Sequence, residues 1–144
     1  MPNFSFTTVE GEQVDLASLK GQYVYIDIWA TWCGPCIGEH PHWDKLKADY
    51  SHQPIAFLTV SIDDNREDWE KMVANKQMEG LQWFADGAWS SELAQHFMVR
   101  AIPRFLLLDM EGKVLDPSAD RPSGKIREVL DELLAAKNLL ASGK

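Results

Sequence analysis

The run of residues 23–29, YVYIDIW, is the feature that most constrains the fold of this chain. Its residues are aromatic or β-branched except for Asp27. Such residues favour a strand, and a strand without polar alternation is buried on both faces, as in a parallel sheet covered by helices. Because a helical pattern begins at residue 35 and continues to about residue 50, the sequence predicts a strand that leads directly into a helix.

The rest of the chain repeats this alternation of strands and helices. The other strands are expected at 4–7, 13–14, 55–62, 81–84, 104–109 and 114–115, and the other helices after Asp64, from Ser90 or Ser91 to about 97, and from 123 to about 140. Asp64 is the expected cap of its helix, because Glu67 follows three residues later. Strand–helix–strand units favour parallel strands with right-handed crossovers. The sequence therefore predicts one α/β domain over residues 1–144, with a mixed central sheet and helices on both faces.

The charge and hydropathy of the chain argue against several classes of partner. Lys and Arg total 14 against 22 Asp and Glu, for a net charge of −8, which disfavours nucleic acids and anionic membranes. No apolar run approaches the roughly 20 residues of a membrane-spanning helix. Residues 1–5 lack the basic region and apolar core of a secretory signal. We therefore expect a soluble chain that, as given, carries no export signal.

The two cysteines, Cys33 and Cys36, are separated by only two residues. A structural disulfide stabilises mainly by closing a long loop, so a ring this short restricts the unfolded chain very little. The pair is therefore better explained as a reactive site. Cys33 lies just before a helix, whose N-terminal N–H groups and positive potential favour a thiolate, and the Cys-x-x-Cys spacing itself lowers the thiol pKa. Cys33 is thus the expected nucleophile, and Cys36, one turn deeper, the expected resolving thiol.

Thiol–disulfide exchange is the chemistry that this pair predicts. The Cys33 thiolate attacks a substrate disulfide and forms a mixed disulfide, which Cys36 then resolves, leaving a Cys33–Cys36 disulfide. Cys36 must lose a proton for the second step, and Asp27 is the candidate base because burial raises a carboxyl pKa towards neutrality. The alternative for Asp27 is a solvated or hydrogen-bonded position at the strand edge. No cofactor is expected beyond the redox-active disulfide.

Other uses of the same cysteines stay open. A Cys-x-x-Cys pair is half of a zinc site, and His40 and His42 could complete it, but a strand–CxxC–helix context favours redox chemistry, so no metal is expected. A metal-delivering module would use Cys33, Cys36 and His40. The direction of electron flow is also open, because the same dithiol reduces or oxidises according to its potential against that of its compartment.

Two segments resemble the thioredoxin superfamily. Residues 25–36, YIDIWATWCGPC, closely resemble the thioredoxin active-site segment, and residues 101–105, AIPRF, resemble the cis-proline loop of that fold. The resemblance implies a cis Ile102–Pro103 bond that packs against the cysteines and leaves the Ile102 backbone free to pair with an extended substrate. The expected substrate-contacting residues are Trp32, Gly34, Pro35, Ile102 and Pro103.

Within that superfamily the chain looks most like the TlpA/ResA-type branch. Its LxxLKG segment at 16–21, Glu39-His40-Pro41 after the second cysteine, and an extra strand–helix segment at about 63–84 carry this resemblance. The resemblance implies a thioredoxin fold with an N-terminal hairpin and a strand–helix insertion. It also implies a protein-disulfide reductase that exchanges electrons with protein disulfides or dithiols and an upstream donor. The expected form is a monomer in an extracytoplasmic (periplasmic) location, with any leader or anchor outside this chain; a cytoplasmic location stays open.

Overall fold

Seven strands form one mixed sheet in the computed structural model, which describes residues 2–142, with side-chain surroundings as far as residue 136. The strands are β1 (Ser5–Thr8), β2 (Gln13–Asp15), β3 (Tyr23–Trp29), β4 (Ile55–Ser61), β5 (Leu81–Phe84), β6 (Arg104–Leu108) and β7 (Val114–Asp116), in the order β2-β1-β5-β4-β3-β6-β7. Strands β3, β4 and β5 pair in parallel, whereas the remaining pairs are antiparallel. The apolar run thus forms β3, near the middle of the sheet, with β4 and β6 on either side.

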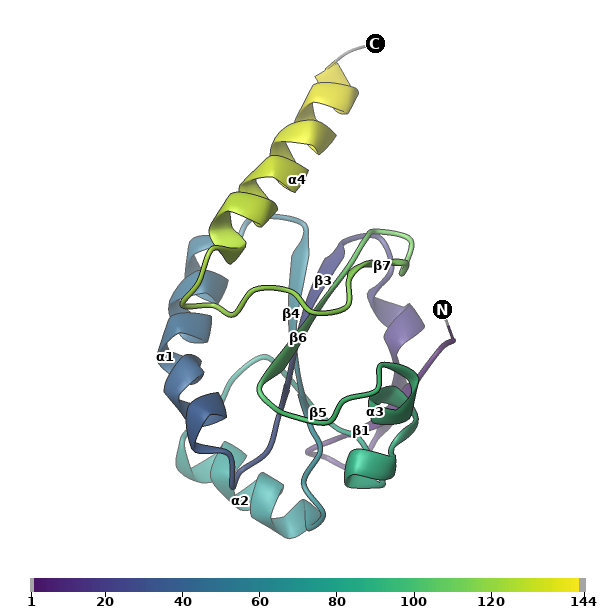
Figure 1. Ribbon diagram of the computed structural model, residues 1–144, viewed down its shortest axis with the longest axis vertical. Helices are drawn as coiled ribbons and strands as arrows, with labels where there is room; N and C mark the ends of the chain where they lie inside the picture. The colour runs from purple at the N-terminus through teal and green to yellow at the C-terminus, as the bar shows by residue number, and fades with distance from the viewer. Residues whose placement is uncertain (1, 143–144) are drawn as a thin grey trace.

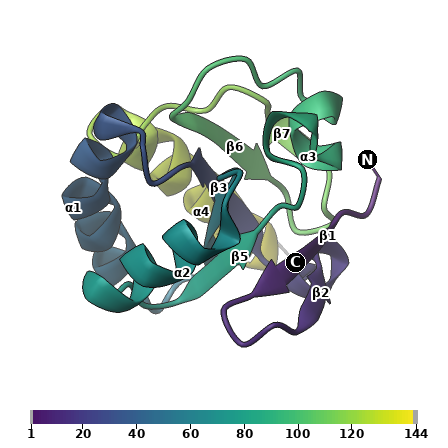
Figure 2. The ribbon, with the colours of Figure 1, turned by 90° about the horizontal axis from the view of Figure 1, so that it is seen from below.

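Helices cover both faces of this sheet (Figures 1 and 2). They are α1 (Gly34–Asp49), α2 (Arg66–Asn75), α3 (Glu92–His96) and α4 (Ile126–Ser142), with short 3-10 turns at Leu16–Leu19 and Ala88–Ser90. Side chains alternate across β3: Ile26 and Ile28 pack in one cluster with Leu93 of α3, whereas Tyr25 packs in another with Trp43 of α1. The predicted α/β class, with a mixed sheet and helices on both faces, is confirmed.

The predicted N-terminal hairpin and insertion are also present. Strand β1 pairs with β2 and then with β5, so the hairpin joins the sheet through the inserted strand. The insertion lies between β4 and β6 and places helix α2 before strand β5. Together they extend the sheet on the far side of β4 from β3.

Two predicted helix starts are wrong. Asn65, not Asp64, caps α2, because its side-chain oxygen accepts a hydrogen bond from the Glu67 N–H at 2.8 Å and the helix begins at the next residue. The last helix begins at Ile126 instead of at Ser123. Ser123 lies in a turn where the Gly124 N–H donates to the Arg121 carbonyl, and its own N–H and hydroxyl bind a side chain of α1.

Helix α4 is the longest helix among the described residues, and it buries one side of its first turns against the sheet. Ile126 and Leu130 are fully buried against the sheet, and Leu134 is nearly so, whereas Val129 is exposed. Within residues 2–142 there is no helix with the length and hydropathy needed to cross a membrane.

Candidate active site

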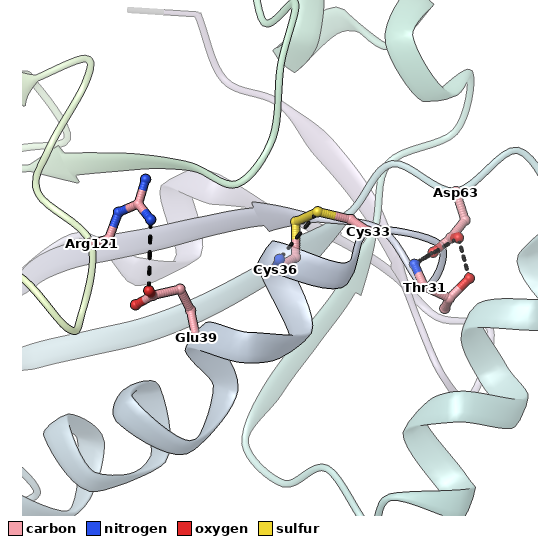
Figure 3. Close-up of a disulfide and its surroundings, with 6 residues drawn as sticks. All are labelled: Thr31, Cys33, Cys36, Glu39, Asp63 and Arg121. Carbon is pink, nitrogen blue, oxygen red and sulfur yellow. Dashed lines mark hydrogen bonds and ion pairs between the residues drawn. A yellow bond between two sulfur atoms is a disulfide. The ribbon is translucent and has the colours of Figure 1, made fainter.

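Cys33 and Cys36 lie where β3 ends and α1 begins, and they form a disulfide with their Cα atoms 5.3 Å apart (Figure 3). Cys33 is the N-cap of α1: its Sγ accepts a hydrogen bond from the Cys36 N–H at 3.2 Å. Pro35 occupies the first turn of the helix, where a missing N–H leaves no hydrogen bond unmade. Cys33 retains 5% exposure and Cys36 has none, so Cys33 is the sulfur nearer to solvent.

An apolar cluster surrounds the disulfide. Both cysteines pack with Trp29 of β3, Trp69 of α2 and Phe84 of β5. Ile102 is partly buried against the same cluster, and the Ile102–Pro103 peptide bond is cis, as the resemblance implies. The Ile102 N–H donates no hydrogen bond to any residue that the structure describes. The distant 101–105 segment is thereby brought to the cysteines.

The other expected substrate-contacting residues lie on the surface at this end of β3. Trp32 is 57% exposed, and Gly34 and Pro35 are exposed as well. Trp32 and Gly34 are the chain neighbours of Cys33, and Pro35 follows Gly34.

Asp27 is buried beneath this surface. Its side chain is 1% exposed, and neither carboxyl oxygen has a hydrogen-bond partner among the described residues. Burial raises the pKa of Asp27 well above its usual range, and the negative charge of Glu39 raises it further. Asp27 therefore lies inside the sheet and not at a strand edge, and its alternation with Ile26 and Ile28 puts it on the α1 face.

Glu39 is a second buried carboxylate, and unlike Asp27 it has several donors. Its oxygens accept the Ser123 N–H at 3.0 Å and the Ser123 hydroxyl at 2.7 Å. The Arg121 guanidinium lies 3.9 Å away (Figure 3). The turn before α4 therefore binds the carboxylate one helical turn after Cys36, across 84 residues of sequence.

A third buried carboxylate, Asp63, holds the segment that leads into Cys33. It accepts the Thr31 N–H at 3.0 Å and the Thr31 hydroxyl at 2.6 Å (Figure 3). The Ser61 hydroxyl donates to its other oxygen at 2.5 Å. Because parallel pairing sets Trp29 beside Ser61, the two strand ends meet at this network.

The histidines considered as metal ligands are placed differently. His40 lies with its ring 4.8 Å from that of Trp29, and its buried Nε2 has no hydrogen-bond partner among the residues that the structure describes. Burial lowers the pKa of His40. His42 is exposed. Among the described residues, no three His, Cys, Asp or Glu side chains gather as a metal site would require.

The chain is similar in sequence to a known family and to known proteins. The sequence profile of the Redoxin family matches residues 1–133. The chain belongs to the Redoxin family. One similar protein is the thiol-disulfide oxidoreductase ResA of Bacillus cereus. The two chains are 27% identical over 115 residues, which cover 80% of this chain and 65% of the relative. ResA of Bacillus thuringiensis subsp. konkukian is 26% identical over 133 residues, 92% of this chain and 73% of the relative. The chain thus spans about two thirds of these relatives' length.

Solved structures give the same assignment. A solution structure from Bacteroides vulgatus, of a protein with a provisional assignment as a thiol-disulfide oxidoreductase, is 41% identical, with a TM-score of 0.85 over 93% of this chain and 88% of that one. A thiol-disulfide oxidoreductase from Bacteroides fragilis NCTC 9343 is 28% identical, with a TM-score of 0.78 over 92% of this chain and 98% of that one. The predicted thioredoxin fold and the TlpA/ResA-like assignment are confirmed.

In this Redoxin-family site, reasoning from the sequence assigned no role to Glu39 or Asp63. A signal for Glu39 was available, because a residue three positions after Cys36 shares its helical face. Asp63 follows β4 at the carboxyl edge of the sheet, where sites of α/β folds gather. Neither signal reveals the partners, Ser123 and Thr31, which only the fold brings close.

Proposed function

We propose that this protein is a thiol–disulfide oxidoreductase that reduces protein disulfides. One observation carries the proposal: Cys33 caps the N-terminus of α1 and keeps 5% exposure, while its disulfide partner Cys36 is fully buried one turn further on. The N-terminal helix potential and the Cys36 N–H both stabilise a thiolate at Cys33. A nucleophile that solvent can reach, backed by a resolving thiol that solvent cannot, is the arrangement that stepwise exchange requires.

The reaction begins with the reduced protein. The Cys33 thiolate attacks one sulfur of the substrate disulfide, a Cys33–substrate bond forms, and the other substrate sulfur leaves with the electron pair and takes up a proton. Cys36 then attacks the Cys33 sulfur, and the second substrate thiol is released. The protein dithiol has lost two electrons and the substrate disulfide has gained them.

Asp27 serves as the proton relay for Cys36 in this scheme. Cys36 must be deprotonated to attack, and no water reaches it directly because it is fully buried. Asp27 lies on the α1 face with a raised pKa, which makes its carboxylate a stronger base than an exposed one. When an upstream donor reduces the disulfide again, the proton held by Asp27 returns to Cys36.

Substrate recognition in this proposal uses the surface around Cys33. Trp32, Gly34 and Pro35 contact the substrate on one side, and the Ile102–Pro103 loop on the other. The Ile102 backbone pairs with an extended segment of the substrate, which aligns the target disulfide with Cys33.

Insulin reduction tests this function. With dithiothreitol as electron donor, the protein should accelerate the precipitation of insulin chains, and Cys33→Ser should abolish the acceleration. Cys36→Ser should trap a mixed disulfide that mass spectrometry detects, since the resolving step is lost. Absence of both acceleration and trapped adduct would refute the proposal.

The proposal also covers the direction of electron flow and the cellular location of the protein. We infer that the dithiol acts as a reductant, and equilibrium with glutathione buffers should give a potential near that of thioredoxin, about −270 mV, and not near that of the oxidant DsbA, about −120 mV. We infer an extracytoplasmic location from the TlpA/ResA-like resemblance, and fractionation of cells that make the full-length protein tests it. A monomer is expected, and light scattering tests that expectation.

A further inference from the structure

Two tryptophans of this chain are exposed, and they lie against each other beside Cys33. Four of the six tryptophans are buried: Trp29, Trp43, Trp69 and Trp83. The other two, Trp32 and Trp89, are 57% and 37% exposed, and their ring centroids are 6.1 Å apart at an interplanar angle of 40°. Since indoles are usually buried where the fold permits it, an exposed pair at the reacting sulfur indicates a surface that binds an apolar group.

The backbone before Trp89 holds the ring in this position. Gly87 and Ala88 are consecutive residues with positive φ, at 98° and 52°. Ala88 is a non-glycine residue in a left-handed conformation, which costs free energy and persists where the surrounding structure enforces it. A Cβ at Gly87 would lie 3.2 Å from the Ser91 backbone nitrogen, so a side chain there would crowd this turn as well as strain its backbone. Such a turn presents Trp89 in one orientation and limits the entropy lost when a substrate binds.

Contacts on the following helix fix the same turn. The Ser91 hydroxyl caps α3 by accepting the Ala94 N–H at 3.2 Å, and the Gln95 amide donates to the Trp89 carbonyl at 3.4 Å. Trp89 thus belongs to a segment anchored at both ends, 53 residues after Cys36 in the chain, and the fold brings it to Trp32. No motif around the cysteines includes it.

Trp32 also borders a hollow beside α2. This open hollow of about 370 Å³ is lined by Trp32, Thr31 and side chains of α2 that include Asp68, Lys71 and Met72. Trp89 does not line it, so the two indoles form a surface separate from this hollow.

We propose that Trp32 and Trp89 together form a subsite for an aromatic side chain adjacent to the target cysteine of a polypeptide substrate, with Trp89 as the residue that determines specificity. This subsite rests on the proposed function and names the substrate class of the same site. The faces of two tilted indoles offer a third ring the offset or edge-to-face packing that aromatic groups prefer. The subsite begins at the residue next to the nucleophile, because Trp32 directly precedes Cys33 in the chain. An aromatic ring bound there sets the neighbouring substrate disulfide over the nucleophile.

Two matched peptides test the proposal. Each is a short polar peptide with one cysteine held as a mixed disulfide with thionitrobenzoate, and the residue before that cysteine is tryptophan in one and alanine in the other. The reduced protein attacks the peptide sulfur, a Cys33–peptide disulfide forms, and thionitrobenzoate leaves with the electron pair, so its visible absorbance reports the first step. The measured quantity is the ratio of the second-order rate constants for the two peptides, which cancels any general change in thiol reactivity.

The wild-type protein should react roughly threefold to tenfold faster with the tryptophan peptide, the range that one aromatic contact provides. Trp89→Ala should bring the ratio close to one, and Trp89→Phe, which keeps a ring, should retain most of the preference. Leu115→Ala is the matched control: Leu115 is an exposed apolar residue on β7, which pairs with the end of β6 remote from the cysteines, and its loss should leave the ratio unchanged.

The possible results separate the subsite from the function. A wild-type ratio near one, or a preference that Trp89→Ala retains in full, overturns the subsite while the exchange reaction stands. If the wild-type protein releases no thionitrobenzoate beyond the Cys33→Ser background from either peptide, the proposed function fails and the subsite fails with it. A ratio that falls in Trp89→Ala and is retained in Trp89→Phe supports both.

Discussion

Replacing Asp27 with asparagine should remove a specific pH dependence from the stability of this protein. In the folded state the carboxyl is 1% exposed and has no hydrogen-bond donor among the described residues, so its charged form is strongly disfavoured. The pKa of Asp27 is raised well above its usual value by burial and then by the charge of Glu39. Unfolding returns the group to water, where its pKa is about 3.9. Over the interval between these two values the folded protein keeps a proton that the unfolded chain has released.

The sign and size of the effect follow from proton linkage. Because the folded state binds more protons than the unfolded state in this interval, the free energy of unfolding falls as pH rises. The contribution is complete below about pH 4 and is lost at up to about 1.4 kcal/mol per pH unit until the pH reaches the folded-state pKa of Asp27. The asparagine side chain of the variant has the same shape and no proton to lose, so the wild-type stability should fall relative to that of Asp27→Asn.

Urea unfolding of the oxidised protein measures this difference. Between about pH 5 and about pH 7 the free energy of unfolding of the wild type, minus that of Asp27→Asn, should fall, by up to about 1.4 kcal/mol per pH unit. Asp64→Asn is the control: Asp64 is exposed, and its replacement should leave the pH dependence of the wild type unchanged. A difference between wild type and Asp27→Asn that stays constant over this interval would falsify the buried, protonated state of Asp27.

Three further variants test the surroundings of the site. Glu39→Gln removes the charge that adds to the raised pKa of Asp27, so the pH-dependent loss of stability should end at a lower pH and be smaller in total in the same urea titration. Asp63→Ala leaves the Thr31 N–H and hydroxyl without their acceptor, and urea unfolding should show a loss of about 3 kcal/mol; an unchanged midpoint would mean that water replaces the carboxylate at no cost. Trp43→Ala empties a buried site among aromatic neighbours and should cost about 3–5 kcal/mol, seen as a lower Tm.

The sequence was sufficient for the parts of the fold that local pattern determines. The apolar run 23–29 became β3 with burial on both faces, because six of its seven residues are aromatic or β-branched and leave few alternatives. The position of Cys33 at a helix N-terminus followed from the helical pattern after it. The predicted start of α4, Ser123, lies three residues before the observed start. The prediction was wrong because polar residues such as Ser123 suit a helix start and a turn equally well. A contact with Glu39 decided between them, and no local pattern encodes it.

The same limit applies to the site. The burial of Asp27 was predictable, since a lone charge in an apolar strand that helices cover has nowhere to reach water. The hydrogen bonds from Ser123 to Glu39 and from Thr31 to Asp63 were not predictable. The first pair is 84 positions apart in the sequence and the second is 32 positions apart. Trp89 lay outside every motif, and its place beside Trp32 depends on the turn at Gly87 and Ala88.

Two buried carboxyl groups on the α1 side of the sheet raise the question of which one holds a proton. Charging both in a region of low polarity is costly, because like charges repel strongly there and neither is solvated. The donors decide the outcome: Glu39 accepts two hydrogen bonds from Ser123 and lies near the Arg121 guanidinium, whereas Asp27 accepts none within the described part of the chain. The negative charge therefore belongs to Glu39 and the proton to Asp27. Since the donors to Glu39 come from the turn before α4, we expect that distant turn to influence the proton affinity of Asp27 in the proposed exchange with Cys36.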